Sequence, residues 1–244
     1  MRTLLLLLAF LPSCSRDADR PLRVAVAANF AVAFAAVAPD VAASTGIVAE
    51  AVVGSTGLLA AQIGNGAPFD LLLAADEVRP ELLERSGHVA EVGRAVYAGG
   101  RLALVGSAVD PARPPAELLV DPRVRRVAIA NPAVAPYGAA AVEVLERLGV
   151  RDAVEERLVR GENVGQAFSF AHAGSAEIAF VALAQARAAK VPHVEVPASL
   201  HAPIRQGAAV LRGPRSAEAA AFLAALVSPA VQRKIESFGY ARVD

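Results

Sequence analysis

From residue 22 onward, short apolar runs alternate with segments of helical period, and this alternation most constrains how the chain can fold. Short buried strands separated by helices are typical of βαβ units, whose strands form a parallel sheet covered by helices on both faces. The sequence therefore predicts an α/β protein. Strands are expected at 22–28, 47–53, 70–75, 101–105, 124–130 and 178–182, and helices at 30–44, 58–64, 78–86, 139–148 and 165–172.

The alternation weakens in two places. Glycines interrupt it between Gly93 and Gly106, with a proline-rich stretch following at 111–122, and a second proline cluster occupies 192–203. Two interruptions far apart in one chain predict a discontinuous two-lobe protein. The first lobe is expected to hold residues 21–100 plus 199–244, and the second residues 101–198.

The N-terminal segment, residues 1–20, has the pattern of an export signal followed by a short linker. A basic start precedes an apolar run at 4–11, which is too short to span a bilayer. Cys14, the only cysteine of the chain, follows that run directly, as in bacterial lipoprotein signals. We therefore expect export, with the mature protein either periplasmic or anchored outside the cytoplasm by a lipid on Cys14.

The composition excludes several classes of protein. Lys and Arg together number 24, as do Asp and Glu, so the formal net charge is zero and a general nucleic-acid binder is disfavoured. A single cysteine excludes a disulfide framework or a thiolate-cluster metal site. The four histidines show no helical pairing, which disfavours a metal centre.

Four predicted strand-to-helix loops carry hydroxyl, amide and backbone N–H groups but no Lys, Arg or His. Ligands of open parallel sheets bind where such loops lead into helix N-termini, which present unpaired N–H groups and a partial positive charge. Several of them converging on one cleft would hold an anion without any cationic side chain. The loops are Ala28-Asn29, Gly54-Ser55-Thr56-Gly57, Ala135-Pro136-Tyr137-Gly138 and Asn163-Val164-Gly165-Gln166.

Each loop also has a plainer interpretation. Asn29, Ser55 and Thr56 are residues that commonly cap helices, and Gly138 and Gly165 are residues that commonly shape turns. Neither a Walker A motif nor a dinucleotide fingerprint is present, which disfavours a nucleotide site.

An exported serine hydrolase is the alternative from another class of protein. Ser55 would be its nucleophile and Asp70 or Asp76 would orient its base, although the residues around Ser55 lack the G-x-S-x-G elbow. Asp70 and Asp76 are interpreted instead as structural residues of the lobe. An oxyanion sensor is a third class, disfavoured because no output domain follows. The candidate bases for the hydrolase are His88, His172, His193 and His201.

Six stretches, in order along the mature chain, closely resemble the molybdate-binding proteins, the periplasmic substrate-binding subunits of molybdate ABC transporters. It is the combination of GST, NGAPFD, APYG and ENVGQ that is specific. The stretches are VAVAANF (24–30), VVGSTGLLAAQIGNGAPFDLLLAAD (52–76), YAGGRLALVGS (97–107), NPAVAPYGAAA (131–141), GENVGQAF (161–168) and AEIAFVALAQ (176–185).

The resemblance implies a type II periplasmic-binding fold. Each of two lobes has a mostly parallel sheet flanked by helices, and an oxyanion lies in the cleft between the lobes. The implied protein is not an enzyme. It needs no cofactor, binds molybdate or tungstate, delivers the anion to an inner-membrane ABC permease, and is a monomer.

The site implied by the resemblance contains only neutral donors, so molybdenum is bound only as its oxyanion. Family members often carry Ser or Thr at the position of Ala28, and another branch uses a tyrosine that the FVAL stretch here lacks. The chain thus matches the branch that uses Asn29. The ligand-binding residues carried over are Ala28, Asn29, Ser55, Tyr137 and Val164.

Elementary chemistry agrees with such a site. A dianion that loses its hydration needs many hydrogen bonds in return, and each bond to a charged group contributes about 1.5–3 kcal/mol. Fixed donors favour an anion without a proton, which disfavours phosphate, whereas sulfate would be separated only by the size of the cavity. A receptor for sulfate, phosphate or another small anion remains the main alternative among binding proteins.

Overall fold

The computed structural model describes residues 20–242, which form ten strands, ten α-helices and two short 3₁₀ helices. The strands are β1 (Leu22–Ala27), β2 (Ala49–Gly54), β3 (Leu71–Leu73), β4 (Val89–Gly100), β5 (Leu102–Val105), β6 (Val127–Ala130), β7 (Leu158–Gly161), β8 (Ile178–Ala182), β9 (His193–Glu195) and β10 (Ile204–Leu211). The helices are α1 (Ala31–Thr45), α2 (Thr56–Gly64), α3 (Val78–Arg85), α4 (Pro115–Leu119), α5 (Pro136–Arg147), α6 (Arg151–Val154), η1 (Glu155–Arg157), α7 (Val164–His172), α8 (Leu183–Ala189), η2 (Ala198–Leu200), α9 (Ser216–Leu226) and α10 (Pro229–Ser237).

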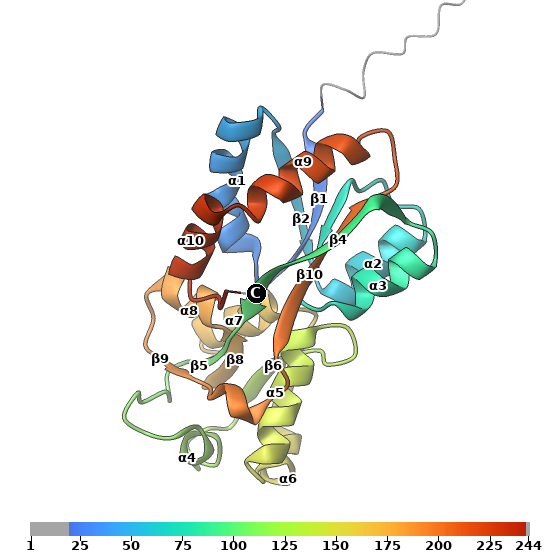
Figure 1. Ribbon diagram of the computed structural model, residues 1–244. Helices are drawn as coiled ribbons and strands as arrows, with labels where there is room; N and C mark the ends of the chain where they lie inside the picture. Colours follow the sequence, from blue (N-terminus) through green and yellow to red (C-terminus); the bar gives the residue numbers. More distant parts are fainter. Residues whose placement is uncertain (1–19, 243–244) are drawn as a thin grey trace, which may run out of the picture.

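The strands form two separate five-stranded sheets, one above the other in Figure 1. The first has the order β2-β1-β3-β10-β4 and the second the order β7-β6-β8-β5-β9. Within the described part of the chain, β10 runs against its neighbours in the first sheet and β5 against its neighbours in the second, while the other pairs are parallel. The predicted fold, two mostly parallel sheets flanked by helices, is confirmed.

We call the part built on the first sheet lobe 1 and the part built on the second sheet lobe 2. The strands of lobe 1 come from residues 22–100 and 204–211, and those of lobe 2 from residues 102–195. The chain passes between the sheets after β4 and again before β10 (Figure 1). The lobe boundaries expected from the sequence, at residues 100 and 199, remain a prediction.

Lobe 1 is a three-layer structure because strand β1 is apolar on both faces. Leu22, Val24 and Val26 pack in a core shared with α1, α9 and α10, whereas Ala25 faces a second core shared with α2 and α3 (Figure 1). A continuous apolar run is expected for a parallel strand that is covered on both sides. The same holds in lobe 2, where every residue of β5, β6 and β8 is buried.

Strand β4 differs from the expectation that the strand pattern weakens after Gly93. It is a twelve-residue strand that pairs with β10 and was not among the strands expected from the sequence, although the chain leaves lobe 1 directly after it. Gly93 has a φ of 78° and lies where the register with β10 shifts, as at a β-bulge. Gly93 therefore lies at a bend within the strand, whereas Gly99 and Gly100 lie at its end.

The proline-rich segment after β5 is ordered by one carboxylate. Asp121 accepts hydrogen bonds from the side chains of Arg123 and Arg113, each at 2.7 Å. These bonds hold the pKa of the Asp121 carboxyl well below its usual range. They join the segment before α4 to the turn that follows it.

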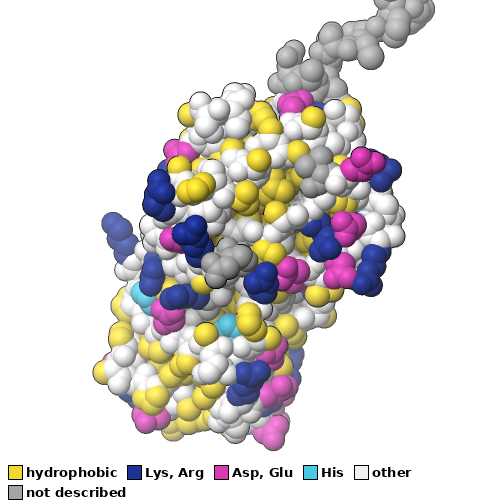
Figure 2. All heavy atoms as spheres, in the orientation of Figure 1, with side chains coloured by type: hydrophobic (Ala, Val, Ile, Leu, Met, Phe, Trp, Pro, Cys, Tyr) yellow, Lys and Arg dark blue, Asp and Glu magenta, His cyan; other side chains and the backbone are white. Residues whose placement is uncertain are grey.

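The expected export signal and the lipidation candidate Cys14 lie outside the described residues. Within residues 20–242, no helix combines the length and the apolar character that crossing a membrane requires. On the face shown in Figure 2, Lys and Arg side chains lie close to Asp and Glu side chains. One ion pair among the described residues joins Arg205 to Glu77 at 2.6 Å.

Candidate functional site

The four loops singled out in the sequence meet at one small cavity between the lobes. Two belong to lobe 1 and lead into α1 and α2, and two belong to lobe 2 and lead into α5 and α7. The free volume of the cavity is about 10 Å³, which is room for a single small species. The lining residues are Ala27, Ala28, Asn29, Gly54, Ser55, Thr56, Ala75, Ala135, Pro136, Tyr137, Asn163 and Val164.

The lining is neutral but rich in donors. None of these residues is Lys, Arg, His, Asp or Glu. Tyr137 and Val164 belong to the first turns of α5 and α7, where a backbone N–H has no carbonyl of its own helix within reach. Helix N-termini from both lobes therefore direct N–H groups and partial positive charge at the cavity.

Ser55 provides the most telling atom of the cavity. It occupies the N-cap position of α2, yet its side chain makes no capping hydrogen bond. Its residue is 3% exposed, and its hydroxyl oxygen is buried without a hydrogen-bond partner among the described residues. A buried hydroxyl left unpaired costs about 1–3 kcal/mol, so Ser55 is available to a partner other than the described residues.

Thr56, next along the chain, is used differently. Its hydroxyl oxygen accepts a hydrogen bond from the backbone N–H of Ala75 at 2.9 Å. This bond ties the start of α2 to the end of β3. Thr56 therefore has a structural partner, whereas Ser55 does not.

Asn29 lies in the cavity wall, is 1% exposed, and is held by a buried network. Its side-chain Nδ2 donates to Oε1 of Gln206 at 2.9 Å, and the hydroxyl of Tyr240 donates to its backbone oxygen at 2.7 Å. The N-cap of α1 is Phe30, so the side chain of Asn29 does not cap that helix. One N–H of the amide is thus fixed by Gln206, which sets the plane of the amide beside the cavity.

Ala28 contributes little besides its methyl group. Its own backbone N–H donates to the carbonyl oxygen of Gly54 at 2.9 Å and is therefore engaged within lobe 1. The backbone N–H of Phe30 is likewise engaged, with the carbonyl oxygen of Ala27 at 2.8 Å. Among the five expected ligand residues, Ala28 is the one whose structure offers least to an anion.

In lobe 2, Asn163 and Tyr137 divide their roles between side chain and backbone. The side-chain oxygen of Asn163 accepts from the backbone N–H of Gln166 at 3.1 Å and so caps α7. The hydroxyl of Tyr137 caps no helix and instead accepts a hydrogen bond from Nε2 of Gln206 at 3.3 Å. Both loops also present backbone N–H groups at a helix start to the cavity.

All three tyrosines of the chain belong to the network behind the cavity. The hydroxyl of Tyr97 contacts Oε1 of Gln206 at 2.9 Å and the carbonyl oxygen of Ala74 at 3.1 Å. Burial raises the pKa of Tyr97 and Tyr137 well above the ordinary value, and it raises that of Tyr240 too. The network therefore stays uncharged at any physiological pH.

Gln206 and the tyrosines other than Tyr137 were not among the site residues expected from the sequence. One signal was present, since Gln206 is a polar residue directly before the apolar end of β10 and is 0% exposed. The other was the scarcity of tyrosine in the chain.

The lobes touch each other directly beside the cavity. The N–H of Gly57 in α2 donates to the carbonyl oxygen of Val134 in lobe 2 at 2.8 Å. The core of lobe 2 also continues into Ala27, Ala28 and Ala75 of lobe 1. This is a closed arrangement of the two lobes.

Comparison with known proteins agrees with this geometry. The family model for bacterial extracellular solute-binding proteins matches residues 22–241. The molybdate-binding protein ModA of Azotobacter vinelandii is 37% identical over 237 residues, which are 95% of this chain and 94% of that protein. The chain belongs to the molybdate-binding family of bacterial extracellular solute-binding proteins. The resemblance in the sequence is thereby confirmed.

Other members of the family extend the comparison. ModA of Rhodobacter capsulatus is 40% identical over 184 residues, covering 73% of this chain and 71% of its own. The solved structure of the Azotobacter vinelandii periplasmic molybdate-binding protein superimposes with a TM-score of 0.86 at 36% identity, covering 91% of this chain and all of its own. The sulfate-binding protein SubI of Mycobacterium tuberculosis, at 18% identity and a TM-score of 0.74, shares the fold.

The geometry also bears on the hydrolase alternative, which membership of the solute-binding family does not favour. None of His88, His172, His193 and His201 is among the residues that line the cavity with Ser55. No cluster of three His, Cys, Asp or Glu residues suited to a metal ion occurs within residues 20–242.

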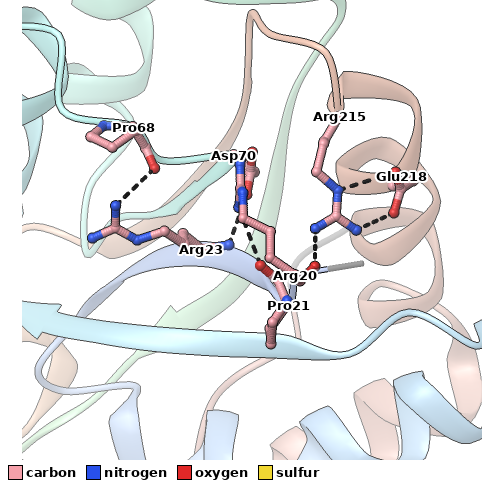
Figure 3. A network of polar contacts seen from close by, with 7 residues as sticks. All are labelled: Arg20, Pro21, Arg23, Pro68, Asp70, Arg215 and Glu218. Carbon is pink, nitrogen blue, oxygen red and sulfur yellow. Dashed lines mark hydrogen bonds and ion pairs between the residues drawn. The ribbon is translucent and has the colours of Figure 1, made fainter. Parts of the chain in front are cut away.

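The two aspartates proposed as orienting groups are engaged elsewhere. Asp70 accepts from the backbone N–H of Arg23 at 2.8 Å and from the guanidinium of Arg20 at 2.7 and 3.0 Å (Figure 3). Asp76 accepts from the backbone N–H of Arg79 at 2.9 Å and forms an ion pair with its side chain at 2.7 Å. Both carboxylates thus stabilise lobe 1, which agrees with their structural interpretation.

Proposed function

We propose that this chain captures molybdate, and tungstate as its close analogue, by closing two lobes around the oxyanion. The observation that carries the proposal is the unpaired hydroxyl of Ser55 in a small neutral cavity ringed by helix N-termini. The names of the relatives supply the identity of the anion. The proposed ligand-binding residues are Asn29, Ser55, Tyr137 and Val164, with Ala28 contributing to the shape of the wall.

Neutral donors suit a tetrahedral dianion that carries no proton. Hydrogen bonds to a charged acceptor contribute about 1.5–3 kcal/mol each, so the Ser55 hydroxyl and a set of backbone N–H groups offset the loss of hydration. A protonated anion such as phosphate would need an acceptor among these donors. The cavity wall offers no carboxylate or neutral histidine for that purpose.

Sulfate also lacks a proton, so size must distinguish it. The cavity is small and bounded by backbone on both lobes, which favours one radius of anion over another. We propose that the larger oxyanions span the donors of both lobes, whereas sulfate leaves some of these hydrogen bonds stretched.

The proposed setting follows from the family. We propose that the protein acts outside the cytoplasm as a monomer, held by a lipid on Cys14 or released into the periplasm. In this setting the closed, loaded form would dock on the permease of an ABC transporter. Binding that favours the closed state over the open one is a shift of population between two conformations. We assign no catalytic step to Ser55 and no cofactor to the chain.

The test is isothermal titration of the mature protein with molybdate, tungstate, sulfate and phosphate in parallel. Tight one-to-one binding of molybdate and tungstate, with little heat from sulfate and phosphate, is the expected result. Tight binding of sulfate or phosphate with no response to molybdate would overturn the proposed substrate. No heat from any of the four would overturn oxyanion capture as a whole.

A further inference from the structure

A glycine at the start of α2 makes a main-chain hydrogen bond between the lobes beside the cavity. The N–H of Gly57 donates to the carbonyl oxygen of Val134 at 2.8 Å. A methyl group placed on Gly57 would lie 3.0 Å from both Cα and the carbonyl oxygen of Val134, and 3.1 Å from its Cβ. The three atoms nearest to such a methyl all belong to this one residue of the opposite lobe.

The contact lies directly beside the residues that line the cavity. Gly57 follows Ser55 and Thr56 in the chain, and Val134 precedes Ala135 and Tyr137. The distance between Gly57 and Val134 therefore sets how far the donors of lobe 1 stand from those of lobe 2. A change of a few tenths of an ångström there changes every hydrogen bond that an anion makes to both lobes.

We infer that Gly57 is a positioning residue for the closed state: the lack of a side chain lets the lobes approach until the Gly57–Val134 hydrogen bond forms. This inference deepens the proposed function and rests on it. Gly57 acts through the separation of the lobes and does not itself need to touch the anion.

The expected effect of an alanine at this position differs between the two states. Carbon atoms in ordinary contact stand about 3.5–4.0 Å apart, so the methyl forces the main chains apart by a few tenths of an ångström. Two of the three opposing atoms are main-chain atoms, which cannot rotate away as a side chain would. When the lobes are apart, these neighbours are gone, and alanine is the better helix former.

The experiment compares Gly57→Ala with Gly64→Ala, a glycine of the same helix whose added methyl meets no atom within 4 Å. Molybdate affinity is measured by titration, and the melting temperature is measured without ligand. For Gly57→Ala we expect the Kd for molybdate to rise at least tenfold while the melting temperature does not fall. For Gly64→Ala both values should stay close to those of the wild type.

Three outcomes would count against the inference. If the wild type binds molybdate and Gly57→Ala binds it equally well, Gly57 does not position the lobes. If the melting temperature of unliganded Gly57→Ala falls, the methyl damages lobe 1 itself rather than the closed state. If the wild type binds no molybdate, the proposed function is overturned and this inference with it.

Discussion

At the scale of single residues, Ser55 and Thr56 are neighbours with similar chemistry and opposite uses. The Thr56 hydroxyl has a backbone partner at 2.9 Å, whereas the Ser55 hydroxyl is buried with no partner among the described residues. A hydroxyl that stabilises the fold and one reserved for a ligand should respond differently to removal. The pair therefore provides an internal control.

We expect Ser55→Ala to weaken molybdate binding tenfold or more, because a hydrogen bond to a charged group is lost and 1.4 kcal/mol corresponds to about one decade. The melting temperature without ligand should stay the same or rise, since no bond within the protein is broken. Thr56→Val should instead lower the melting temperature, because the buried N–H of Ala75 loses its acceptor. Titration and thermal unfolding of both variants separate the two roles; unchanged affinity in Ser55→Ala would remove that residue from the site.

Position 206, next to Asn29, is where we expect an introduced charge to affect ligand binding most. We expect Gln206→Glu to bind molybdate less well as the pH rises, because burial raises the pKa of the introduced carboxyl and its ionisation places a negative charge next to Asn29. At low pH the protonated carboxyl is neutral and binding should recover in part. Titrations between about pH 5 and 8 test this; a uniform loss at every pH would mean that only the geometry of the network matters.

The four loops that line the cavity could be predicted from the sequence, whereas Gln206 could not. The loops could be predicted because each is a local pattern at a strand end. Gln206 hydrogen-bonds to Asn29 across 177 residues of sequence, so nothing near either residue signals the contact. Long-range pairings of this kind depend on the order of strands in the sheet, which the local pattern does not specify.

At the scale of elements, the strand order explains what was missed. The weak pattern around Gly93 belongs to β4, which is stabilised by pairing with β10 and not by its own composition. A strand at a sheet edge with bulges carries less apolar periodicity than a central one. The central strands β5, β6 and β8 were predicted because their apolar runs are continuous, and β1 because Arg23 is the only polar residue in it.

Helix α5 depends on a close approach to strand β6. A methyl on Gly138 would lie 2.2 Å from the carbonyl oxygen of Ala130 and 2.8 Å from its carbon. We expect Gly138→Ala to destabilise the protein by about 1–3 kcal/mol or more, because the helix must shift off the sheet. Gly213→Ala is the control, since its methyl meets no atom within 4 Å.

Chemical denaturation of the Gly138 and Gly213 variants gives the two free energies of unfolding. Equal stability of Gly138→Ala and wild type would show that α5 can shift away from β6 without loss of stability. A loss confined to Gly138→Ala would confirm that glycine is needed where this helix begins beside the cavity.

At the scale of the whole molecule, the site should be insensitive to pH. No residue with an ordinary titration between pH 5 and 9 lines the cavity, and burial raises the pKa of Tyr137 well above 10.0. The donors therefore keep their protons across this range, and we expect the wild-type affinity for molybdate to change less than about threefold between pH 6 and 9. A clear bell-shaped or sigmoidal dependence would point to a titrating group that the described cavity does not contain.

The contact between Gly57 and Val134 also belongs to this scale, because it exists only where the two lobes have come together. The sequence predicted the loops on each lobe, but it could not predict the fit between them. That fit depends on the rotation of one lobe relative to the other, to which both crossings between the sheets contribute. The loops that line the cavity could therefore be predicted from the sequence, whereas the size of the cavity could not.

The unpaired hydroxyl of Ser55 bears on the fidelity of transport under the proposed function. If the lobes close without an anion, the Ser55 hydroxyl and the helix-end amides lose their water and form no hydrogen bonds in return. The closed state without an anion is therefore higher in free energy. A permease that responds only to the closed outline would then seldom be engaged by an unloaded carrier. The permease would then not need to contact the anion, because the unsatisfied hydrogen-bonding groups of an empty carrier already disfavour the closed form.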